Sequence, residues 1–146
     1  MASMHDPLYI TYCAAAKDPA EEPMAAAWRY KSSRIDAVLA LAVERGAGFR
    51  ILSGRFGLLA AGEPIPCYDH LLTAGEVPAH AATVARQLAD TGAGGVVYFT
   101  RGAAVDPGTP PYLACCQEAC ERADLPLRVV ELPAGPLDLA MLDLLV

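Results

Sequence analysis

The sequence predicts an α/β fold, a three-layer sandwich with a mostly parallel, Rossmann-like sheet of about four strands and helices on both faces. Two observations support this fold class. Short runs of β-branched and aromatic residues alternate along the chain with longer segments of helical periodicity. The connections between them are short, and right-handed crossovers then place helices on both faces of a parallel sheet. A length of 146 residues corresponds to about one domain, so residues 1–146 are expected to form a single α/β domain.

The N-terminal half contains two predicted strands with a helix between them: a strand at Leu8–Tyr12, a helix from Ser32 or Ser33 to about Arg45, and a strand at Phe49–Leu52. The first strand is β-branched and aromatic. The helix repeats Ile35, Val38 and Leu39 at helical spacing. A serine can cap its start and Gly46 can end it.

The C-terminal half continues the alternation with a helix at about Val77–Thr91, a strand at Gly95–Thr100, a helix from Pro110 to about Ala123, a strand at Leu127–Leu132 and a short helix at Leu137–Val146. The strand at Gly95–Thr100 is apolar throughout, which is typical of parallel strands buried on both faces. Prolines are tolerated in the first turn of the helix that follows it. The last helix is too apolar to stay in water, so it either caps the sheet or mediates dimerisation, and a homodimer is one expected partner arrangement.

Composition argues against a membrane protein. The longest apolar run is Ala37–Val43, far shorter than the roughly 20 residues that span a bilayer. The first residues, MASMHDP, lack the basic and apolar regions of a signal peptide, so a cytoplasmic location is expected.

The cysteines are expected to be reduced thiols, because their number is odd and their spacing irregular: Cys13, Cys67, Cys115, Cys116 and Cys120. Cys116 and Cys120 lie one helical turn apart, but neither a CxxC pair nor a nearby histidine completes a tetrahedral set. No metal site and no cofactor are therefore predicted.

The charge distribution favours an anionic ligand. The net charge of −6 opposes general binding to nucleic acid, since such binding depends on neutralising phosphates. Residues 26–56, however, contain six basic residues against two acidic ones. This segment indicates a phosphate, a nucleotide or a short nucleic-acid stretch as the ligand. Two of its arginines, Arg34 and Arg45, are expected only to solvate an outer helix face.

The predicted binding site lies at the C-terminal edge of the sheet, where ligands bind in open α/β proteins. Cys13, Ser53 and Thr100 follow or end three of the strands. The strand at Phe49–Leu52 leads into Ser53-Gly-Arg-Phe-Gly57, which supplies a hydroxyl, a guanidinium and two flexible glycines. Tyr68, Asp69 and His70 follow soon after.

Two further segments border this edge. In Cys13-Ala-Ala-Ala-Lys17, small residues let the backbone approach a ligand, and Lys17 can bind an anion or act as a nucleophile if burial lowers its pKa. The alternative is a solvated loop lysine. Tyr30 and Ser32 precede a helix N-terminus that favours anions. The alternative there is that Trp28 and Tyr30 form a hydrophobic staple and the serine is only a cap.

These motifs together resemble a known group of proteins. They are Cys-x-x-x-Lys at Cys13–Lys17, Tyr-x-Ser at Tyr30–Ser32, Leu-Ser-x-Arg-Phe-Gly-Leu-Leu at Leu52–Leu59, and Pro-x-Tyr-Asp at Pro66–Asp69. The pattern is similar to an uncharacterised bacterial and phage domain family, itself distantly similar to the peroxide-stress protein YaaA and to the lysine-transferring domain of archaeosine synthase. The similarity covers about residues 8–90.

The resemblance implies action on nucleic acid or a modified nucleobase, and a site built from nine residues: Cys13, Lys17, Tyr30, Ser32, Ser53, Arg55, Gly57, Tyr68 and Asp69. One departure matters. The relatives usually carry a serine and another basic residue after the cysteine, where this chain has Ala14-Ala15-Ala16. The chain lacks polar groups that a transferase would use, which favours binding over inherited catalysis.

Two classes of function follow. In the first, an enzyme acts on a nucleotide, nucleobase or related anionic metabolite, with nucleic-acid modification or a stress response as the expected context. Lys17 and Arg55 would then hold phosphate, Tyr68 would donate a proton or stack, and Ser53 and Asp69 would fix a polar group. In the second, a non-catalytic module senses a ligand at the same edge and docks a partner through the apolar C-terminal helix. The sequence favours the first class narrowly.

Overall fold

A five-stranded, mostly parallel sheet forms the centre of the computed structural model, which describes residues 5–146. The strand order is β4-β3-β1-β6-β7. The bounds are β1 (Pro7–Tyr12), β3 (Gly48–Ser53), β4 (Gly57–Leu59), β6 (Gly95–Arg101) and β7 (Leu127–Leu132). β4 alone runs antiparallel to its neighbour. The predicted α/β class with a mostly parallel sheet is therefore confirmed.

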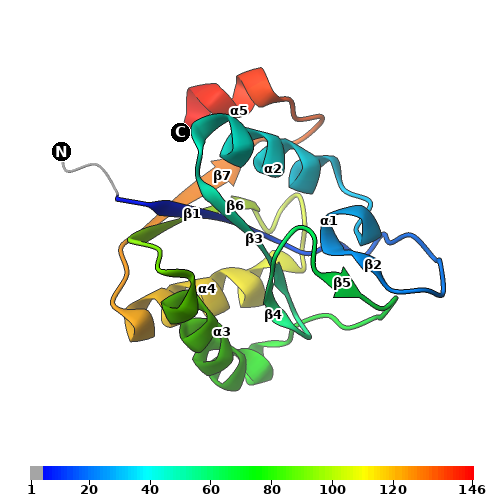
Figure 1. The fold of residues 1–146 in the computed structure, drawn as a ribbon, viewed down its shortest axis with the longest axis horizontal. Coiled ribbons are helices and arrows are strands. Elements are labelled where there is room, and N and C mark those ends of the chain that lie inside the picture. The colour runs from blue at the N-terminus through cyan, green and yellow to red at the C-terminus, as the bar shows by residue number, and fades with distance from the viewer. Residues whose placement is uncertain (1–4) are drawn as a thin grey trace.

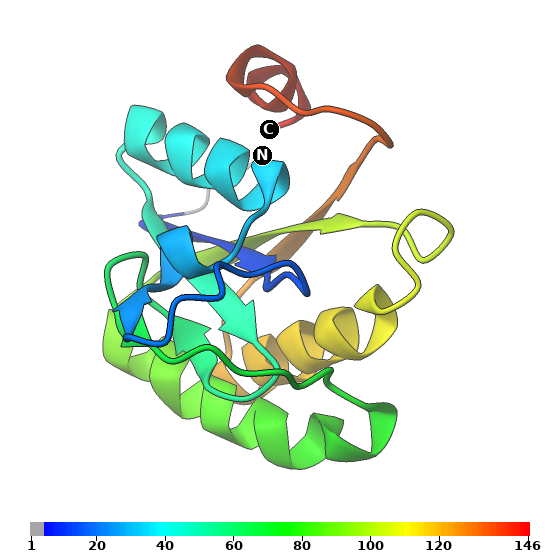
Figure 2. The ribbon, with the colours of Figure 1, turned by 90° about the vertical axis from the view of Figure 1, so that its right-hand side faces the viewer.

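Helices cover both faces of the sheet (Figures 1 and 2). α2 (Ser33–Arg45) and α5 (Leu139–Leu145) lie on one face, and α3 (Val77–Thr91) and α4 (Thr109–Ala123) on the other. The strand order explains this division. The chain moves from β1 to β3 on one side, then returns past β1 to β6 and β7. Because crossovers are right-handed, reversing the direction of travel moves the later helices to the opposite face.

The central strands carry the core. Every residue of Leu8–Tyr12 in β1 and of Gly95–Thr100 in β6 is buried, as expected for parallel strands covered on both faces. β7 lies at the edge and alternates more between exposed and buried residues. The continuous apolar character of these strands therefore indicates their position inside the sheet.

All four predicted strands and the first three predicted helices form within a few residues of their expected bounds. Ser32 is the cap of α2, because its Oγ accepts a hydrogen bond from the N–H of Ile35 at 3.2 Å. Gly46 ends that helix with a φ of 65°, in the left-handed region.

The sequence interpretation missed the short elements: β4, the two-stranded sheet of β2 (Met24–Ala25) and β5 (Pro64–Ile65), α1 (Ala26–Arg29) and the 3-10 turn η1 (Ala74–Glu76). Each has four residues or fewer. Segments of that length show no measurable periodicity, so pattern reading cannot detect them.

The C-terminal helix α5 packs against α2 of its own chain. Leu142 is fully buried in this contact. Arg45 fastens the helix, since its guanidinium pairs with Asp143 at 2.7 Å and donates to the carbonyl of Val146. Arg45 is exposed, as predicted, but it also binds α5 and so does more than solvate the helix.

Within residues 5–146, no helix combines the length and the apolar character that crossing a bilayer would need. All five cysteines are unpaired, and only Cys67 is exposed. Burial raises the pKa of Cys115 to about 12, so this thiol is inert at neutral pH.

Gly57 is the first residue of β4 and ends the turn from β3. Its φ is 75°, and a Cβ there would lie 2.3 Å from Oε1 of Gln87. The Gln87 side chain is itself fixed, because it accepts from the N–H of Leu58 and donates to the carbonyl of Phe56. The turn therefore requires glycine for both conformational and steric reasons.

Replacing Gly57 with alanine is expected to lower the free energy of unfolding by about 1–3 kcal/mol, because the left-handed backbone is strained and Gln87 must move. Urea denaturation followed by circular dichroism measures this loss. Gly62→Ala is the matched control, since a Cβ there meets nothing within 4 Å and the φ is ordinary. Equal stability of the two variants would contradict the role assigned to this turn.

Candidate functional site

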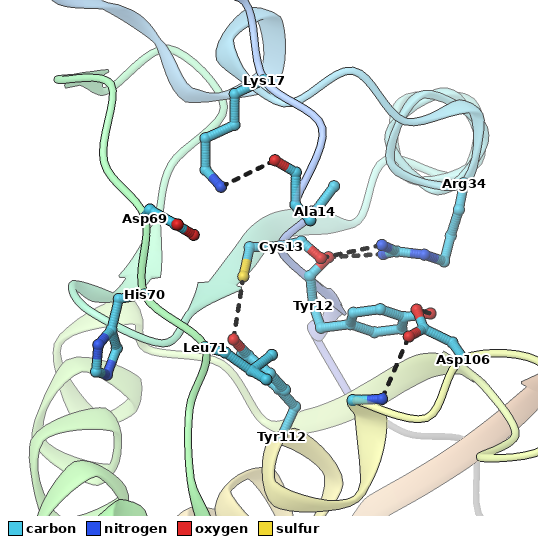
Figure 3. Close-up of a pocket in the computed structure, with 12 residues that line it drawn as sticks. Tyr12, Cys13, Ala14, Lys17, Arg34, Asp69, His70, Leu71, Asp106 and Tyr112 are labelled. Atoms are coloured by element: carbon cyan, nitrogen blue, oxygen red, sulfur yellow. Dashed lines mark hydrogen bonds between the residues drawn. The ribbon is translucent and has the colours of Figure 1, made fainter.

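A cavity of about 190 Å³ opens at the C-terminal edge of the sheet, beside the ends of β1 and β6 (Figure 3). The strand order reverses between these two strands, and in open α/β sheets such a reversal is the usual place for a ligand. The lining residues come from the loops after β1, β5 and β6 and from α2 and α4: Tyr12, Cys13, Ala14, Ala15, Lys17, Arg34, Asp69, His70, Leu71, Asp106, Gly108 and Tyr112.

The size of the cavity limits its ligand. Sites for drug-sized molecules usually enclose about 300–1,000 Å³. A volume of about 190 Å³ holds a phosphate with a sugar, or a single heterocyclic ring, rather than a whole dinucleotide. Any larger ligand must extend beyond the mouth.

Arg34 forms one wall, and the expectation that it solvates an outer helix face is wrong. Only 5% of the residue is exposed. Its guanidinium donates to Oγ1 of Thr11 at 2.7 Å and to the carbonyls of Tyr12 and Cys13 at 2.6 and 3.1 Å. It also stacks 3.5 Å from the centroid of the Tyr12 ring. Burial lowers the pKa of Arg34, but these acceptors at the end of β1 replace the water that the charge has lost.

Asp106 forms the opposite wall, and its carboxylate also has hydrogen-bond partners within the protein. Its Oδ2 accepts from the hydroxyl of Tyr12 at 3.0 Å, and its Oδ1 accepts from the N–H of Gly108 at 3.4 Å. Burial raises the pKa of Tyr12 to about 12, which keeps this hydroxyl a donor. Pro110 and Pro111 have no N–H, so the first turn of α4 offers few free donors to an anion.

Lys17 and Asp69 carry the two charges of the cavity that the protein leaves available. The Lys17 Nζ donates only to the carbonyl of Ala15, at 3.2 Å, and lies 5.0 Å from the Tyr68 ring and 5.7 Å from the Tyr30 ring. Asp69 is exposed, and among residues 5–146 its carboxylate has no hydrogen-bond or ion-pair partner. Figure 3 shows both side chains directed toward the cavity.

Three predicted site residues form a buried hydroxyl cluster behind this wall. The Tyr68 hydroxyl bonds to Oγ of Ser53 at 2.7 Å and to the Tyr30 hydroxyl. Ser53 Oγ also accepts from the N–H groups of Arg55 and Phe56, both at 3.1 Å. Burial is the main cause that raises the pKa of Tyr68 to about 12 and that of Tyr30 still further, so both phenols stay neutral.

Cys13 forms a hydrogen bond with Tyr112 on α4. The Cys13 Sγ lies 3.5 Å from the Tyr112 hydroxyl, which also accepts from the N–H of Leu72 at 3.1 Å. Gly54 makes room for this arrangement, because a Cβ there would lie 2.8 Å from the Tyr112 oxygen. Burial raises the pKa of Tyr112 well above its usual value.

The structure therefore brings together six of the nine predicted site residues, three at the cavity (Cys13, Lys17, Asp69) and three behind it (Tyr30, Ser53, Tyr68). Of the other three, Ser32 caps α2 and Gly57 forms a turn. Arg55 borders the buried cluster, because its N–H donates to Ser53, but its guanidinium is exposed, 5.0 Å from the Phe56 ring and 5.9 Å from the Tyr68 ring.

The basic segment at residues 26–56 does not form one cationic surface. Arg29 is fully buried and donates to the carbonyls of Asp18, Ala20, Glu22 and Ile65. Lys31 pairs with Asp18 at 3.6 Å, and Arg45 is bound to α5. Most of these cations thus serve the fold, and only Lys17, outside the segment, faces the cavity as a free cation among the described residues.

Sequence reasoning missed four residues of the cavity: Tyr12, Arg34, Asp106 and Tyr112. Asp106 follows the strand at Gly95–Thr100 within a Gly- and Pro-containing loop, so its place at the same edge was a usable signal. His70 pairs with Glu76 at 3.0 Å rather than with Asp69. His80 on α3 contacts the carbonyl of Ser53 at 2.8 Å.

No metal centre is evident in the part of the chain that the structure describes, because no three His, Cys, Asp or Glu side chains gather there in a metal-binding arrangement. Cys116 and Cys120 instead hydrogen bond to each other within α4. This bond lowers the pKa of Cys120 and raises that of Cys116.

Arg34→Ala is expected to lower the free energy of unfolding by about 3 kcal/mol or more, because three buried acceptors lose a charged donor together. Chemical denaturation measures the change. Arg45→Ala is the matched control on the same helix, and its exposed ion pair should contribute only about 1 kcal/mol or less. A loss for Arg34→Ala no larger than for the control would contradict the structural role of the buried guanidinium.

The buried phenols predict a loss of stability in alkali. An unfolded tyrosine loses its proton near pH 10, whereas Tyr12 and Tyr68 keep theirs to about 12 in the folded protein. Between these values the unfolded state binds fewer protons, so the free energy of unfolding should fall as pH rises above about 10 and change little from this cause below it. Urea titrations across this range test the prediction, and Tyr68→Phe should make the decline shallower. A stability that is level to pH 12 would contradict it.

Comparison of the chain with protein-family models, with curated proteins and with solved structures finds no match. The resemblance of residues 8–90 to the YaaA-like domains therefore stays a prediction from short motifs.

Proposed function

We propose that the protein binds a nucleoside monophosphate, or a ligand of the same size and polarity, in the cavity at the end of β1. The observation that carries this proposal is the pair of uncommitted charges, the Lys17 ammonium and the Asp69 carboxylate, directed toward one small cavity. The two other charged walls, Arg34 and Asp106, already have partners within the protein.

Lys17 supplies an anchor for the phosphate. Its ammonium is held near two aromatic rings by cation–π attraction, and its one acceptor, the Ala15 carbonyl, is exchangeable for a phosphate oxygen. Ala14 and Ala15 also line the cavity, and their backbone N–H groups have no acceptor within residues 5–146. Small side chains there leave space for a phosphate beside the backbone.

Asp69 supplies the complementary acceptor. A free carboxylate beside a phosphate anchor matches the hydroxyls of a ribose or the amino group of a base, both of which donate hydrogen bonds. Leu71 lines the same cavity and is 63% exposed, so it offers an apolar surface to a base that extends from the mouth. A nucleotide satisfies all three features, whereas inorganic phosphate satisfies only the first.

A free nucleotide suits the molecule better than a nucleic-acid strand. The net charge is −6, and most arginines of the basic segment are bound to the protein itself. A polymer binds mainly through many neutralised phosphates. The available positive charge at this site is that of a single lysine, which is sufficient for one phosphate group.

The alternative function, a module that docks a partner through its C-terminal helix, has less support. α5 already buries Leu142 against α2. Among the described residues of this helix, Leu144 is the large apolar side chain that is exposed, at 88%. The cavity also holds a thiol and an amine, Cys13 and Lys17, beside the proposed ligand. Turnover of a bound nucleotide is therefore the next property to assay.

Binding is tested by a thermal-shift panel of the four ribonucleoside monophosphates, the matching nucleosides, inorganic phosphate and a short single-stranded oligonucleotide, followed by calorimetry. A nucleoside monophosphate should raise Tm and bind with the highest affinity. Lys17→Met and Asp69→Asn should each weaken it about tenfold or more, since each removes a charge-assisted hydrogen bond.

Arg86→Ala is the control, because Arg86 is an exposed cation on α3 outside the cavity. It should bind as the wild type does. A panel without any stabilising nucleotide, or cavity variants that bind like the control, would refute the proposal. If only the oligonucleotide binds tightly, the ligand is nucleic acid rather than a free nucleotide.

A further inference from the structure

A chain of hydroxyl and thiol groups runs from the interior to the cavity wall. We define the hydroxyl–thiol chain by its five members, which form two hydrogen-bonded groups: Ser53, Tyr30 and Tyr68 in the interior, and Cys13 and Tyr112 at the wall. All five are buried, and each carries one proton that it can donate. The directions of these hydrogen bonds follow from counting protons and acceptors.

The inner end of the chain is fixed by Ser53. Its Oγ accepts hydrogen bonds from two backbone N–H groups, those of Arg55 and Phe56, which occupy both of its lone pairs. Ser53 therefore cannot accept from a tyrosine as well. Its own O–H donates to its nearest neighbour, the Tyr68 hydroxyl at 2.7 Å.

Four members remain, with four protons but two hydrogen bonds among them. The Tyr30 and Tyr68 hydroxyls bond to each other, and the Cys13 thiol bonds to the Tyr112 hydroxyl. Each bond holds one proton, and residues 5–146 offer these groups no other acceptor. One proton of each pair therefore has no acceptor within the described protein.

The surroundings of the two pairs differ. Neither Tyr30 nor Tyr68 lines the cavity, whereas Cys13 and Tyr112 both do. Water or a ligand in the cavity can therefore accept the remaining proton of the Cys13–Tyr112 pair, which avoids a costly unsatisfied donor.

The strengths of the two groups at the wall decide between them. A thiol is a weak donor and sulfur a weak acceptor, whereas a phenol is a strong donor. The favourable arrangement lets Cys13 donate to the Tyr112 oxygen and lets Tyr112 donate to an oxygen in the cavity. The Tyr112 oxygen then accepts from Cys13 and from the N–H of Leu72, so both of its lone pairs are used and its proton is free to point outward.

We infer that the Tyr112 hydroxyl is a hydrogen-bond donor to the ligand, and that it selects a ligand with a phosphoryl or carbonyl oxygen at this wall. The inference rests on the proposed function for the identity of the ligand, but the direction of the chain does not depend on it. Tyr112 thus adds a neutral donor to the cationic anchor of Lys17. Neither residue alone distinguishes a phosphate from another anion, but together they prescribe where its oxygens lie.

The direction of the chain is tested without any ligand, by the infrared S–H stretching band of Cys13, assigned through its loss in Cys13→Ala. In the wild type the band should have the frequency of a hydrogen-bonded thiol. Tyr112→Phe should shift it to that of a free thiol, because the acceptor is gone. Tyr68→Phe should leave the thiol hydrogen bonded. An unchanged band in Tyr112→Phe, or a free thiol only in Tyr68→Phe, would overturn the inferred direction.

The donor role is tested by calorimetry with adenosine 5′-monophosphate as the probe. Tyr112→Phe should weaken binding roughly tenfold, the usual effect of losing one hydrogen bond to a charged group. Tyr98→Phe is the matched control, because the Tyr98 hydroxyl is fully buried, has no partner and lies outside the cavity. Circular dichroism confirms that each variant is folded.

The two experiments separate the possible failures. If the wild type binds the probe and Tyr112→Phe binds it equally well, the donor role is wrong while the proposed function stands. If the wild type binds no probe, the proposed function fails, and the infrared result alone decides whether the Tyr112 proton points into the cavity.

Discussion

The buried guanidinium of Arg34 is the interaction on which the site depends. It joins α2 to the end of β1 through three hydrogen bonds and stacks on Tyr12. Tyr12 in turn donates to Asp106, which binds the start of α4. One cation therefore connects the helix layer on one face of the sheet with the helix layer on the other. The cavity occupies the space that this connection keeps open.

The cavity has two kinds of charge, and the difference between them is informative. The charges of Arg34 and Asp106 have hydrogen-bond partners within the protein: Arg34 donates three hydrogen bonds and the Asp106 carboxylate accepts two. Lys17 and Asp69 lie on loops that follow β1 and β5, and the protein leaves their charges largely unpaired. Arg34 is thus held on a helix, and Asp106 is held by its hydrogen bonds to Tyr12 and Gly108, whereas the available charges lie on loops, where binding residues are common.

Most of the fold could be predicted from the sequence, because strands such as Leu8–Tyr12 and helices such as Ser33–Arg45 have a clear period and clear caps. The edge of the sheet that carries the site was predictable for the same reason. The position of Arg34 was not, since an arginine on an amphipathic helix is normally exposed and only tertiary contacts made burial favourable. Tyr112 was missed because nothing local distinguishes it from a core aromatic residue. Its role depends on Cys13, 99 positions away along the chain.

Arg29 has a further consequence for how the site recognises a ligand. Its guanidinium collects carbonyls from both the segment after Lys17 and the segment before Tyr68, and β2 pairs with β5 beside it. The two loops that carry Lys17 and Asp69 are therefore fastened into one body. The positions of these two backbone segments relative to each other are therefore set before a ligand binds. The site therefore favours molecules whose anionic group and hydrogen-bond donor are separated by the distance between the two loops.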